Sequence, residues 1–175
     1  MLEVELKYPV PDLAPIRRQL SAWNARPCGR QHERDVYYNA PHRDFAETDE
    51  ALRVRYTGGD CFVTYKGPKI ELKGTKAREE YNLQVESGAA CEEIFGRLGF
   101  QPTAEVNKLR EIFELDDATV TLDEVDGLGT FIEIEVLAEE NEEDAADRVT
   151  ALAKELGVEG MPLYTSYLEL ILSKQ

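Results

Sequence analysis

The sequence predicts an α+β protein in which antiparallel strands close around a charged interior, with helices packed outside. The first observation is the segment 2–7, which alternates an apolar residue with a charged one. An extended strand here places Glu3, Glu5 and Lys7 on one face. The second observation is that the same alternation, with charges of both signs on one face, returns in almost every later strand-like segment.

A single alternating strand also fits an open sheet with one wet face and weak surface salt bridges. The recurrence of mixed charge along one face favours the other arrangement. In that arrangement the charged faces point inward into a shared enclosed space, and the apolar faces point outward beneath the helices.

The length and charge limit the class of protein. A chain of 175 residues is expected to form one domain, residues 1–175, with a proper core. A formal charge of −15 argues against a duplex nucleic-acid binder and against an anionic membrane surface as partner. A small polyanion remains compatible, because the local placement of cations matters more than their total.

The chain shows no membrane-spanning pattern and no signal-peptide pattern, so we expect a cytoplasmic protein. Its three cysteines, Cys28, Cys61 and Cys91, lie far apart and lack C-x-x-C spacing. We interpret them as reduced thiols that mostly fill the core, and we expect no zinc site. A homodimer is an open alternative to a monomer.

Apolar stripes at helical spacing predict four helices. The first follows Asp12, the second follows the capping residue Ser87, and the longest follows Asn141. The last is predicted over residues 167–173. Period-two segments predict strands at 2–7, 33–38, 51–56, 62–66, 77–86, 119–123 and 131–136. A further long strand is predicted to end at residue 115.

Two segments are predicted to be loops. Residues 39–50 are rich in turn-forming residues, and we expect them to cover one end of the enclosed space. The lysine-rich residues 70–76 are predicted to be mobile.

The charged strand faces collect acids and bases in equal number. The acids are Glu3, Glu5, Asp35, Glu80, Asp123, Glu133 and Glu135. The bases are Lys7, Arg53, Arg55, Lys66, Arg78, Lys108 and Arg110. The face is therefore near neutral, and the surplus acid of the chain must lie elsewhere, as in the predicted helix start at 139–147.

Buried cations without partners are costly, so this surface predicts a ligand. A phosphate chain suits lysine and arginine, and arginine binds its oxygens in bidentate fashion. A hard divalent cation such as Mg²⁺ suits the carboxylates. The two sets together indicate a metal–polyphosphate complex.

The motif Glu3-x-Glu5-x-Lys7 at the N-terminus resembles the signature of the CYTH, or triphosphate tunnel metalloenzyme, superfamily. The chain looks most similar to its class IV adenylyl cyclase branch. Segments 35–38, 48–55, 64–69, 108–110 and 122–135 extend the resemblance in order and at similar spacing. The opening motif alone is weak, whereas the ordered set is specific and covers nearly the full length.

The resemblance implies an eight-stranded antiparallel barrel that forms a tunnel, with helices outside. It implies that Mg²⁺ or Mn²⁺ is held by Glu3, Glu5, Glu133 and Glu135. It implies that a triphosphate is bound by Lys7, Arg53, Arg55, Lys66, Arg78, Lys108 and Arg110. Asp123 is expected near the metal or a reacting oxygen.

Two reactions fit such a site. In an adenylyl cyclase the ribose 3′-oxygen of ATP attacks the α-phosphate, which gives cyclic AMP and pyrophosphate. In a triphosphatase, water attacks the terminal phosphate of an inorganic or organic triphosphate, such as thiamine or nucleoside triphosphate. Tyr37 and Lys66 could form a proton-transfer pair in the second case, or serve only as phosphate contacts or wall.

The resemblance favours the cyclase, with the triphosphatase as the alternative. A third option is a module that binds polyphosphate without turnover. The carboxylates argue against it, because an anion receptor gains nothing from acids in its cavity.

Overall fold

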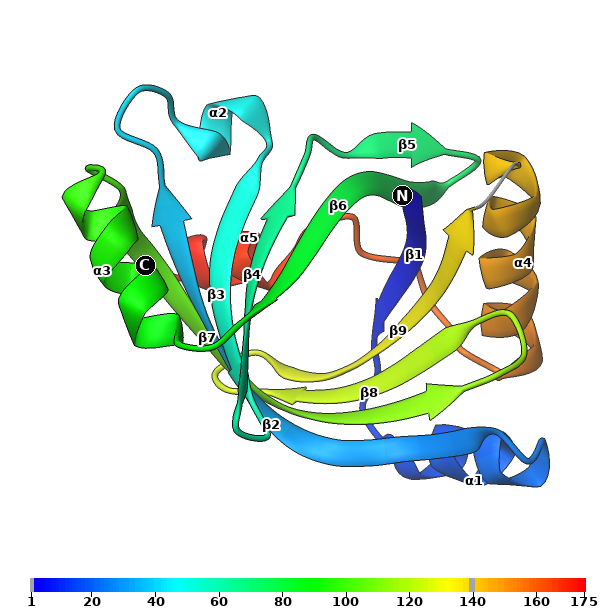
Figure 1. Cartoon of the computed structure of the whole chain (residues 1–175). Coiled ribbons are helices and arrows are strands. Elements are labelled where there is room, and N and C mark those ends of the chain that lie inside the picture. The colour runs from blue at the N-terminus through cyan, green and yellow to red at the C-terminus, as the bar shows by residue number, and fades with distance from the viewer. Residues whose placement is uncertain (1, 139–140) are drawn as a thin grey trace.

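The computed structural model describes residues 2–138 and 141–175. These residues form nine strands and five helices (Figure 1). The strands are β1 (Leu2–Pro9), β2 (Arg26–Asn39), β3 (Ala51–Thr57), β4 (Asp60–Lys66), β5 (Ile70–Leu72), β6 (Thr75–Val85), β7 (Gln101–Glu114), β8 (Thr119–Val125) and β9 (Gly129–Ala138). The helices are α1 (Ala14–Ala22), α2 (Phe45–Thr48), α3 (Gly88–Arg97), α4 (Glu142–Glu155) and α5 (Tyr167–Leu172).

Eight strands form a closed antiparallel barrel. They follow the order β1-β9-β8-β7-β2-β3-β4-β6, and β6 pairs back to β1. The short strand β5 continues the line of β4 and forms a hairpin with β6. The predicted α+β barrel with helices outside is therefore confirmed.

The register of the strands decides which side chains share the interior. Residues that lie directly opposite each other in an antiparallel pair point to the same side of the sheet. Glu5 lies opposite Glu135, and Asp35 lies opposite Arg55. A slip of one residue in any strand would turn its charged face outward, so the alternation in sequence fixes the register.

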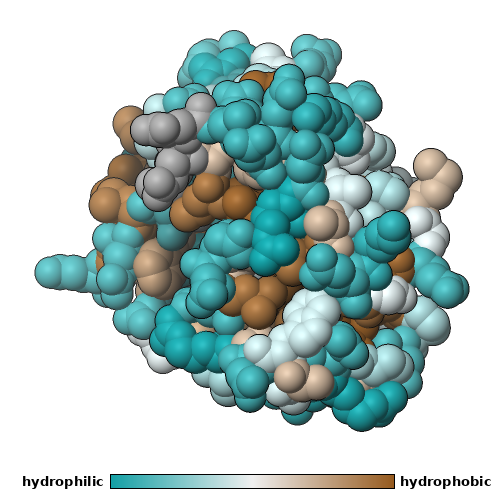
Figure 2. Space-filling model, turned by 90° about the vertical axis from the view of Figure 1, so that its right-hand side faces the viewer, coloured by the Kyte–Doolittle hydropathy of each residue, from teal (hydrophilic) through white to brown (hydrophobic). Residues whose placement is uncertain are grey.

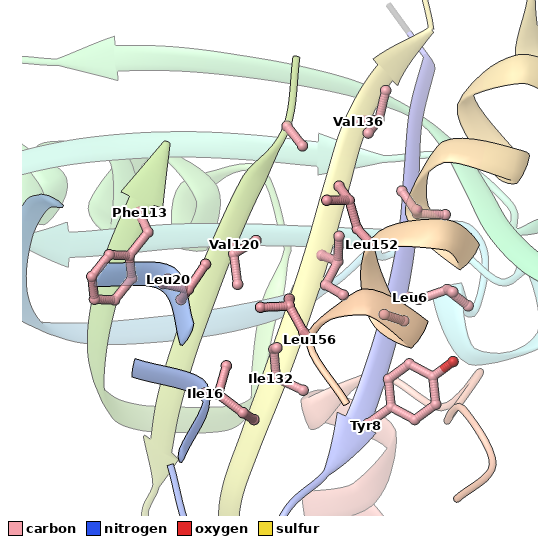
Figure 3. Packing of buried hydrophobic residues seen from close by; sticks show 14 of the residues in the cluster. Leu6, Tyr8, Ile16, Leu20, Phe113, Val120, Ile132, Val136, Leu152 and Leu156 are labelled. Atoms are coloured by element: carbon pink, nitrogen blue, oxygen red, sulfur yellow. The ribbon is translucent and has the colours of Figure 1, made fainter. Parts of the chain in front are cut away.

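The largest apolar core lies outside the barrel, between its wall and two helices. Val120 and Ile132 on the strands pack with Leu20 of α1 and Leu152 of α4, and all four are fully or almost fully buried (Figure 3). Full burial of such a side chain stabilises the fold by about 1.5–3 kcal/mol. The barrel is thus inverted, with apolar residues outside and charged residues inside, as the sequence predicts.

A second apolar cluster joins α3 to the opposite wall. Val36, Tyr38 and Val54 on the strands pack against Phe95 and Phe100. The hydroxyl groups of Tyr38 and Tyr56 both donate to Glu92 of α3. These contacts fix α3 on the outer face of β2 and β3.

The third cluster closes one end of the barrel. Tyr167 of α5 packs on Tyr37, Val106, Val125 and Phe131, which face the interior near that end. Leu168, Leu170 and Ile171 of the same helix complete the cluster. The C-terminal helix therefore plugs the barrel, a role that its sequence does not predict.

Residues 39–50 lie beside this plug and are more ordered than a loop. They carry α2, whose N-cap Asp44 accepts a hydrogen bond from the backbone of Ala46. Side chains from the α2 segment and from α5, among them Phe45 and Leu168, line a small hollow.

The prediction of a mobile loop at residues 70–76 is wrong. Strand β5, a turn with positive φ at Lys73 and Gly74, and the first residues of β6 occupy this stretch. Thr75 and Lys76 are buried. A contact distant in sequence explains why this stretch is ordered, because Lys76 lies opposite Glu5 of β1.

Other predictions concern the cysteines, the membrane and the acidic helix start. The three thiols are free, but Cys28 is exposed, so it does not fill the core. In the described part of the chain, no helix has the length and apolar character needed to cross a membrane. The predicted acidic start at 139–147 lies partly outside the described residues, at 139–140, and α4 begins with Glu142, Glu143 and Asp144.

Candidate active site

A polar cavity of about 310 Å³ lies inside the barrel. Eight basic side chains line it: Lys7, Arg53, Arg55, Lys66, Lys76, Arg78, Lys108 and Arg110. Seven carboxylates line it with them: Glu3, Glu5, Glu33, Asp35, Glu80, Glu133 and Glu135. The two sets nearly cancel, as the sequence predicts.

Asp35 forms the centre of one ion cluster. Arg55 donates to both of its oxygens, at 2.7 Å each, and Lys108 donates at 3.0 Å. Arg53, two residues before Arg55 on the same face of β3, donates at 3.4 Å. Burial works to raise the pKa of Asp35, but these three cations hold that pKa well below its usual value.

Glu33 extends this cluster along β2. Lys108 lies 2.9 Å from its Oε2, and Arg55 lies 3.1 Å from the same atom. Burial opposes ionisation of Glu33, whereas Arg110, Lys108 and Arg55 lower its pKa to about 2. Three cations of the cavity are therefore held in place by two buried carboxylates.

Arg110 forms the centre of a second cluster. Its guanidinium donates to both oxygens of Asp123, at 2.7 and 2.5 Å, and to Glu133 at 2.5 Å. Lys7 lies 3.1 Å from the other oxygen of Glu133. The ring of Tyr167 lies under the Lys7 ammonium, 4.0 Å from its centroid, in a cation–π contact.

The third cluster is acidic. Glu5 of β1 lies directly opposite Glu135 of β9, and Glu3 is two residues along the same face. Lys66 lies 2.5 Å from Glu80 and 3.5 Å from Glu3, and Lys76 pairs with Glu5. Burial, with Glu135 and Glu80 acting in the same direction against Lys66, raises the pKa of Glu3 to about 8.

The donors of the acidic cluster fit a hard divalent cation. Like charges directly opposite in a sheet destabilise each other, and oxygen-coordinated Mg²⁺ would relieve that repulsion. Over residues 2–138 and 141–175, no three acidic, histidine or cysteine side chains already stand in coordinating positions. Their present partners are Lys66 and Lys76, so coordination requires these lysines to move from the carboxylates.

Every predicted site residue except Asp123 lines the cavity. Asp123 is fully buried behind the lining, where Arg110 and Tyr167 donate hydrogen bonds to its carboxylate oxygens. Arg78 lines the cavity, but its Nε donates to the Gly67 carbonyl at 2.7 Å and its Nη2 to the Asp49 carbonyl at 2.8 Å. Its remaining N–H groups are the part available to a ligand.

Three residues that contact the charged clusters of the site were not predicted. Glu33 lies on the same face as Asp35 and could have been found from the period of two. Lys76 lies in the stretch interpreted as a loop. Tyr167 enters from a helix, and no strand pattern could have indicated it.

Comparison with known proteins agrees with this geometry. A protein-family model described as the CYTH domain matches residues 1–161. A Methanocaldococcus jannaschii protein provisionally named an adenylate cyclase is 38% identical over 173 residues, covering 97% of this chain and 98% of that protein. Adenylate cyclase CyaB of Aeromonas hydrophila is 26% identical over 168 residues, covering 93% of this chain and 84% of CyaB.

A solved structure gives the same result for the fold. A Pyrococcus horikoshii protein superposes with a TM-score of 0.88 at 39% identity, over 99% of each chain. The inverted barrel, its charged cavity and the family match lead to one conclusion. The chain belongs to the CYTH domain family.

Proposed function

We propose that the protein is a divalent-metal-dependent enzyme that converts ATP to cyclic AMP and pyrophosphate. The observation that carries the proposal is the enclosed cavity, in which a basic set suited to a phosphate chain meets the acidic cluster of Glu3, Glu5 and Glu135. The names of the two curated relatives support the cyclase reaction over others.

Ligand binding would be an exchange of partners. Without substrate, the cations and carboxylates of the cavity neutralise each other, for example Lys66 with Glu80 and Lys76 with Glu5. Phosphate oxygens would take over the lysines and arginines, and the released carboxylates would take a cation. The ligand therefore replaces buried ion pairs, which avoids leaving either set unpaired.

In this proposal the phosphate chain is bound by Lys7, Arg53, Arg55, Lys66, Lys76, Lys108 and Arg110. Arg53, Arg55 and Lys108 are pre-positioned by Asp35, and Arg110 is pre-positioned by Asp123. Arg78 serves partly in recognition, because it also holds the backbone at Gly67 and Asp49. Such preorganised cations stabilise the charge that develops on the phosphate oxygens during transfer.

Glu3, Glu5, Glu133 and Glu135 would hold Mg²⁺ or Mn²⁺. When bound, the metal would polarise the reacting phosphate and lower the pKa of the attacking hydroxyl. Glu133 differs from the others because Lys7 and Arg110 already compensate it; burial opposes ionisation, yet these cations and Lys76 hold its pKa well below its usual value. Glu133 would therefore contact both the metal and the basic side chains Lys7 and Arg110.

The reaction would join the ribose 3′-oxygen to the α-phosphorus, release the proton of the 3′-hydroxyl to water, and break the bond between that phosphorus and the bridging oxygen to the β-phosphate. Pyrophosphate leaves with the bonding electron pair. Arg110 and Lys108 are the side chains that would absorb its charge. Asp123 would act by holding Arg110, since the carboxylate does not reach the cavity itself.

A triphosphatase is the second candidate, and the composition of the cavity favours it. Charged and polar side chains make up most of its lining, and the apolar members within the described chain are few: Tyr37, Ala51, Phe62, Tyr167 and Leu168. A nucleobase would find little apolar surface there. In that reaction Tyr37 and Lys66 are the candidate proton-transfer pair, and Lys66 is held by Glu3 and Glu80.

The deciding experiment is incubation with Mg²⁺ or Mn²⁺ and, separately, ATP, thiamine triphosphate or inorganic triphosphate, followed by chromatography of the products. Cyclic AMP with pyrophosphate supports the cyclase. Orthophosphate with a diphosphate supports the triphosphatase and overturns the cyclase. Binding of triphosphate without any turnover would identify a binding module and overturn both enzymes.

A further inference from the structure

The side chain of Glu33 has no part in the exchange of partners proposed above, although it lies inside the basic set. It is 3% exposed and lines the cavity from β2. Its Oε2 lies 2.9 Å from Nζ of Lys108, 3.1 Å from Nη2 of Arg55 and 3.9 Å from Nε of Arg110. One carboxylate oxygen therefore lies among three cations that the proposed function gives to phosphate.

The contacts of this oxygen are electrostatic and poorly aligned. Within the described residues, Oε2 of Glu33 is buried and accepts no well-aligned hydrogen bond. Asp35, two residues along the same face, differs because Arg55 donates to both of its oxygens and Lys108 donates to one of them. Charge-assisted hydrogen bonds of this kind are roughly twice as strong as neutral ones. Asp35 is therefore a fixed part of the cation cluster, whereas a phosphate oxygen can replace Glu33.

A second buried group without a partner lies beside Glu33. Thr57 of β3 is directly opposite Glu33 in the antiparallel pair. Side chains at such positions lie on the same side of the sheet, with Cβ atoms about 4.5–5.5 Å apart. Over residues 2–138 and 141–175, the buried Thr57 hydroxyl forms no hydrogen bond. The amide of Gln31, which donates to Oε1 of Glu33 at 3.2 Å, completes an uncharged pair of donors beside the carboxylate.

We propose that Glu33 is a resident counter-ion that a bound phosphate chain displaces. In the empty cavity Glu33 compensates its three neighbouring cations. When phosphate oxygens take these cations, the carboxylate turns away and accepts hydrogen bonds from the Thr57 hydroxyl and the Gln31 amide. Glu33 therefore weakens the binding of any anion that competes for the same cations. The inference rests on the proposed binding of a phosphate chain in the cavity, but not on which reaction follows.

This effect is distinct from that of the net charge of the chain. Acids and bases nearly cancel in the cavity, so the formal charge of −15 belongs mostly to the outer surface. Figure 2 shows that this surface is predominantly hydrophilic on the α4 side. Solvent-exposed charges farther from a ligand than about 10 Å are largely screened at 0.1 M salt. Glu33 acts at contact distance, so its removal should affect anion binding more than removal of an exterior carboxylate.

Calorimetric titration with inorganic triphosphate, without metal, tests the competition. Glu33→Gln keeps the size of the side chain and removes its charge, so it should bind triphosphate about tenfold more tightly than the wild type. Glu124→Gln removes the same charge from the outer face of β8, where Glu124 pairs with Arg30, and should leave the Kd unchanged. A folded Glu33→Gln protein that binds no more tightly than the wild type would overturn the inference.

Thr57→Val tests where the displaced carboxylate goes, and it leaves the ion cluster of the empty protein intact. Loss of a hydrogen bond to a charged group should raise the Kd for triphosphate about tenfold. In the Glu33→Gln background the same substitution should change the Kd little, because no carboxylate is displaced. Equal effects of Thr57→Val in the two backgrounds would contradict the proposed movement of Glu33.

The same titrations separate two kinds of failure. If triphosphate binds and neither Glu33→Gln nor Thr57→Val alters the Kd, this inference alone is wrong. If neither the wild type nor any variant binds triphosphate, the proposed phosphate-binding function is wrong as well.

Discussion

The hydroxyl of Tyr167 donates a hydrogen bond of 2.7 Å to Oδ2 of Asp123 and so joins the C-terminal helix to the inner wall of the barrel. Asp123 in turn holds the guanidinium of Arg110 in bidentate fashion. The ring of Tyr167 packs edge-on against Phe131, 5.1 Å between centroids, and lies under Lys7. The plug and the basic end of the cavity therefore form one structural unit.

Replacement of Tyr167 by phenylalanine should lower both stability and turnover. The substitution keeps the aromatic contacts but leaves Asp123 with one donor fewer, which costs about 1–3 kcal/mol of unfolding free energy at a buried site. Urea denaturation measures this loss. Turnover should fall because Arg110 is held less firmly, whereas KM should change less than kcat.

Tyr164→Phe provides the matched control. Its hydroxyl also makes one hydrogen bond, to the Gly74 carbonyl at 2.7 Å, but the residue is exposed and water can replace the partner. Equal losses in the two variants would contradict a special role for Tyr167.

Arg55→Ala should weaken the binding of inorganic triphosphate measured by calorimetry without metal. A lost hydrogen bond to a charged group costs about 1.5–3 kcal/mol, or roughly a ten- to hundredfold higher Kd. Arg34→Ala removes an arginine from the outer face of the neighbouring strand and should leave the Kd unchanged. Circular dichroism must show that both variants fold; an unaltered Kd for folded Arg55→Ala would remove this residue from the site.

Glu135→Gln should weaken Mn²⁺ binding in a titration followed by electron paramagnetic resonance. The amide keeps the size of the side chain but removes one of the two carboxylates that face each other across β1 and β9. Glu124→Gln, on the outer face of β8, should bind Mn²⁺ as the wild type does. Unchanged affinity in Glu135→Gln would show that the metal is held elsewhere.

Glu33 should stabilise the fold at neutral pH and lose this effect in acid. Its folded pKa of about 2 lies below the ordinary value of 4.5, so its contribution is present above pH 4.5 and disappears as the pH falls through 2. Glu33→Gln should therefore be less stable than the wild type at pH 7, and the difference should shrink below pH 4.5. Thermal unfolding of the two proteins at pH 7 and at a pH below 4.5 measures this difference in stability. A difference that does not change with pH would contradict the assigned pKa.

The strand pattern accounts for how much of this site could be predicted. Alternation at residues 3–7 and 53–55 fixes which side chains face inward, because a period of two leaves only two choices and the apolar set must be buried under helices. The partners of those side chains could not be predicted. That Arg55 meets Asp35, or that Lys66 meets Glu80, depends on strand order and stagger.

The burial of Lys76 and the position of residues 167–172 were not predicted for the same reason, because both depend on tertiary contacts. Lys76 follows a glycine turn in a lysine-rich stretch and has the local signature of an exposed loop, yet the carboxylate of Glu5 on β1 makes its burial tolerable. Residues 167–172 have an ordinary helical pattern with a capping box at Ser166. Only the tertiary structure shows that this helix enters the barrel end.

The close approach of α3 to β3 provides a test that does not involve the cavity. A Cβ added at Gly88 would lie 2.5 Å from the ring of Tyr56, far inside van der Waals contact. The ring cannot turn away freely, because the Tyr56 hydroxyl donates to Glu92 of the same helix. Gly88→Ala should therefore lower the unfolding free energy by about 1–3 kcal/mol, as other overpacked sites do.

Gly96→Ala is the control in the same helix, where an added Cβ meets nothing within 4 Å. It should stabilise the protein by roughly 0.5–1 kcal/mol, since alanine loses less conformational freedom than glycine. Equal effects of the two substitutions in urea denaturation would contradict the packing of α3 described above.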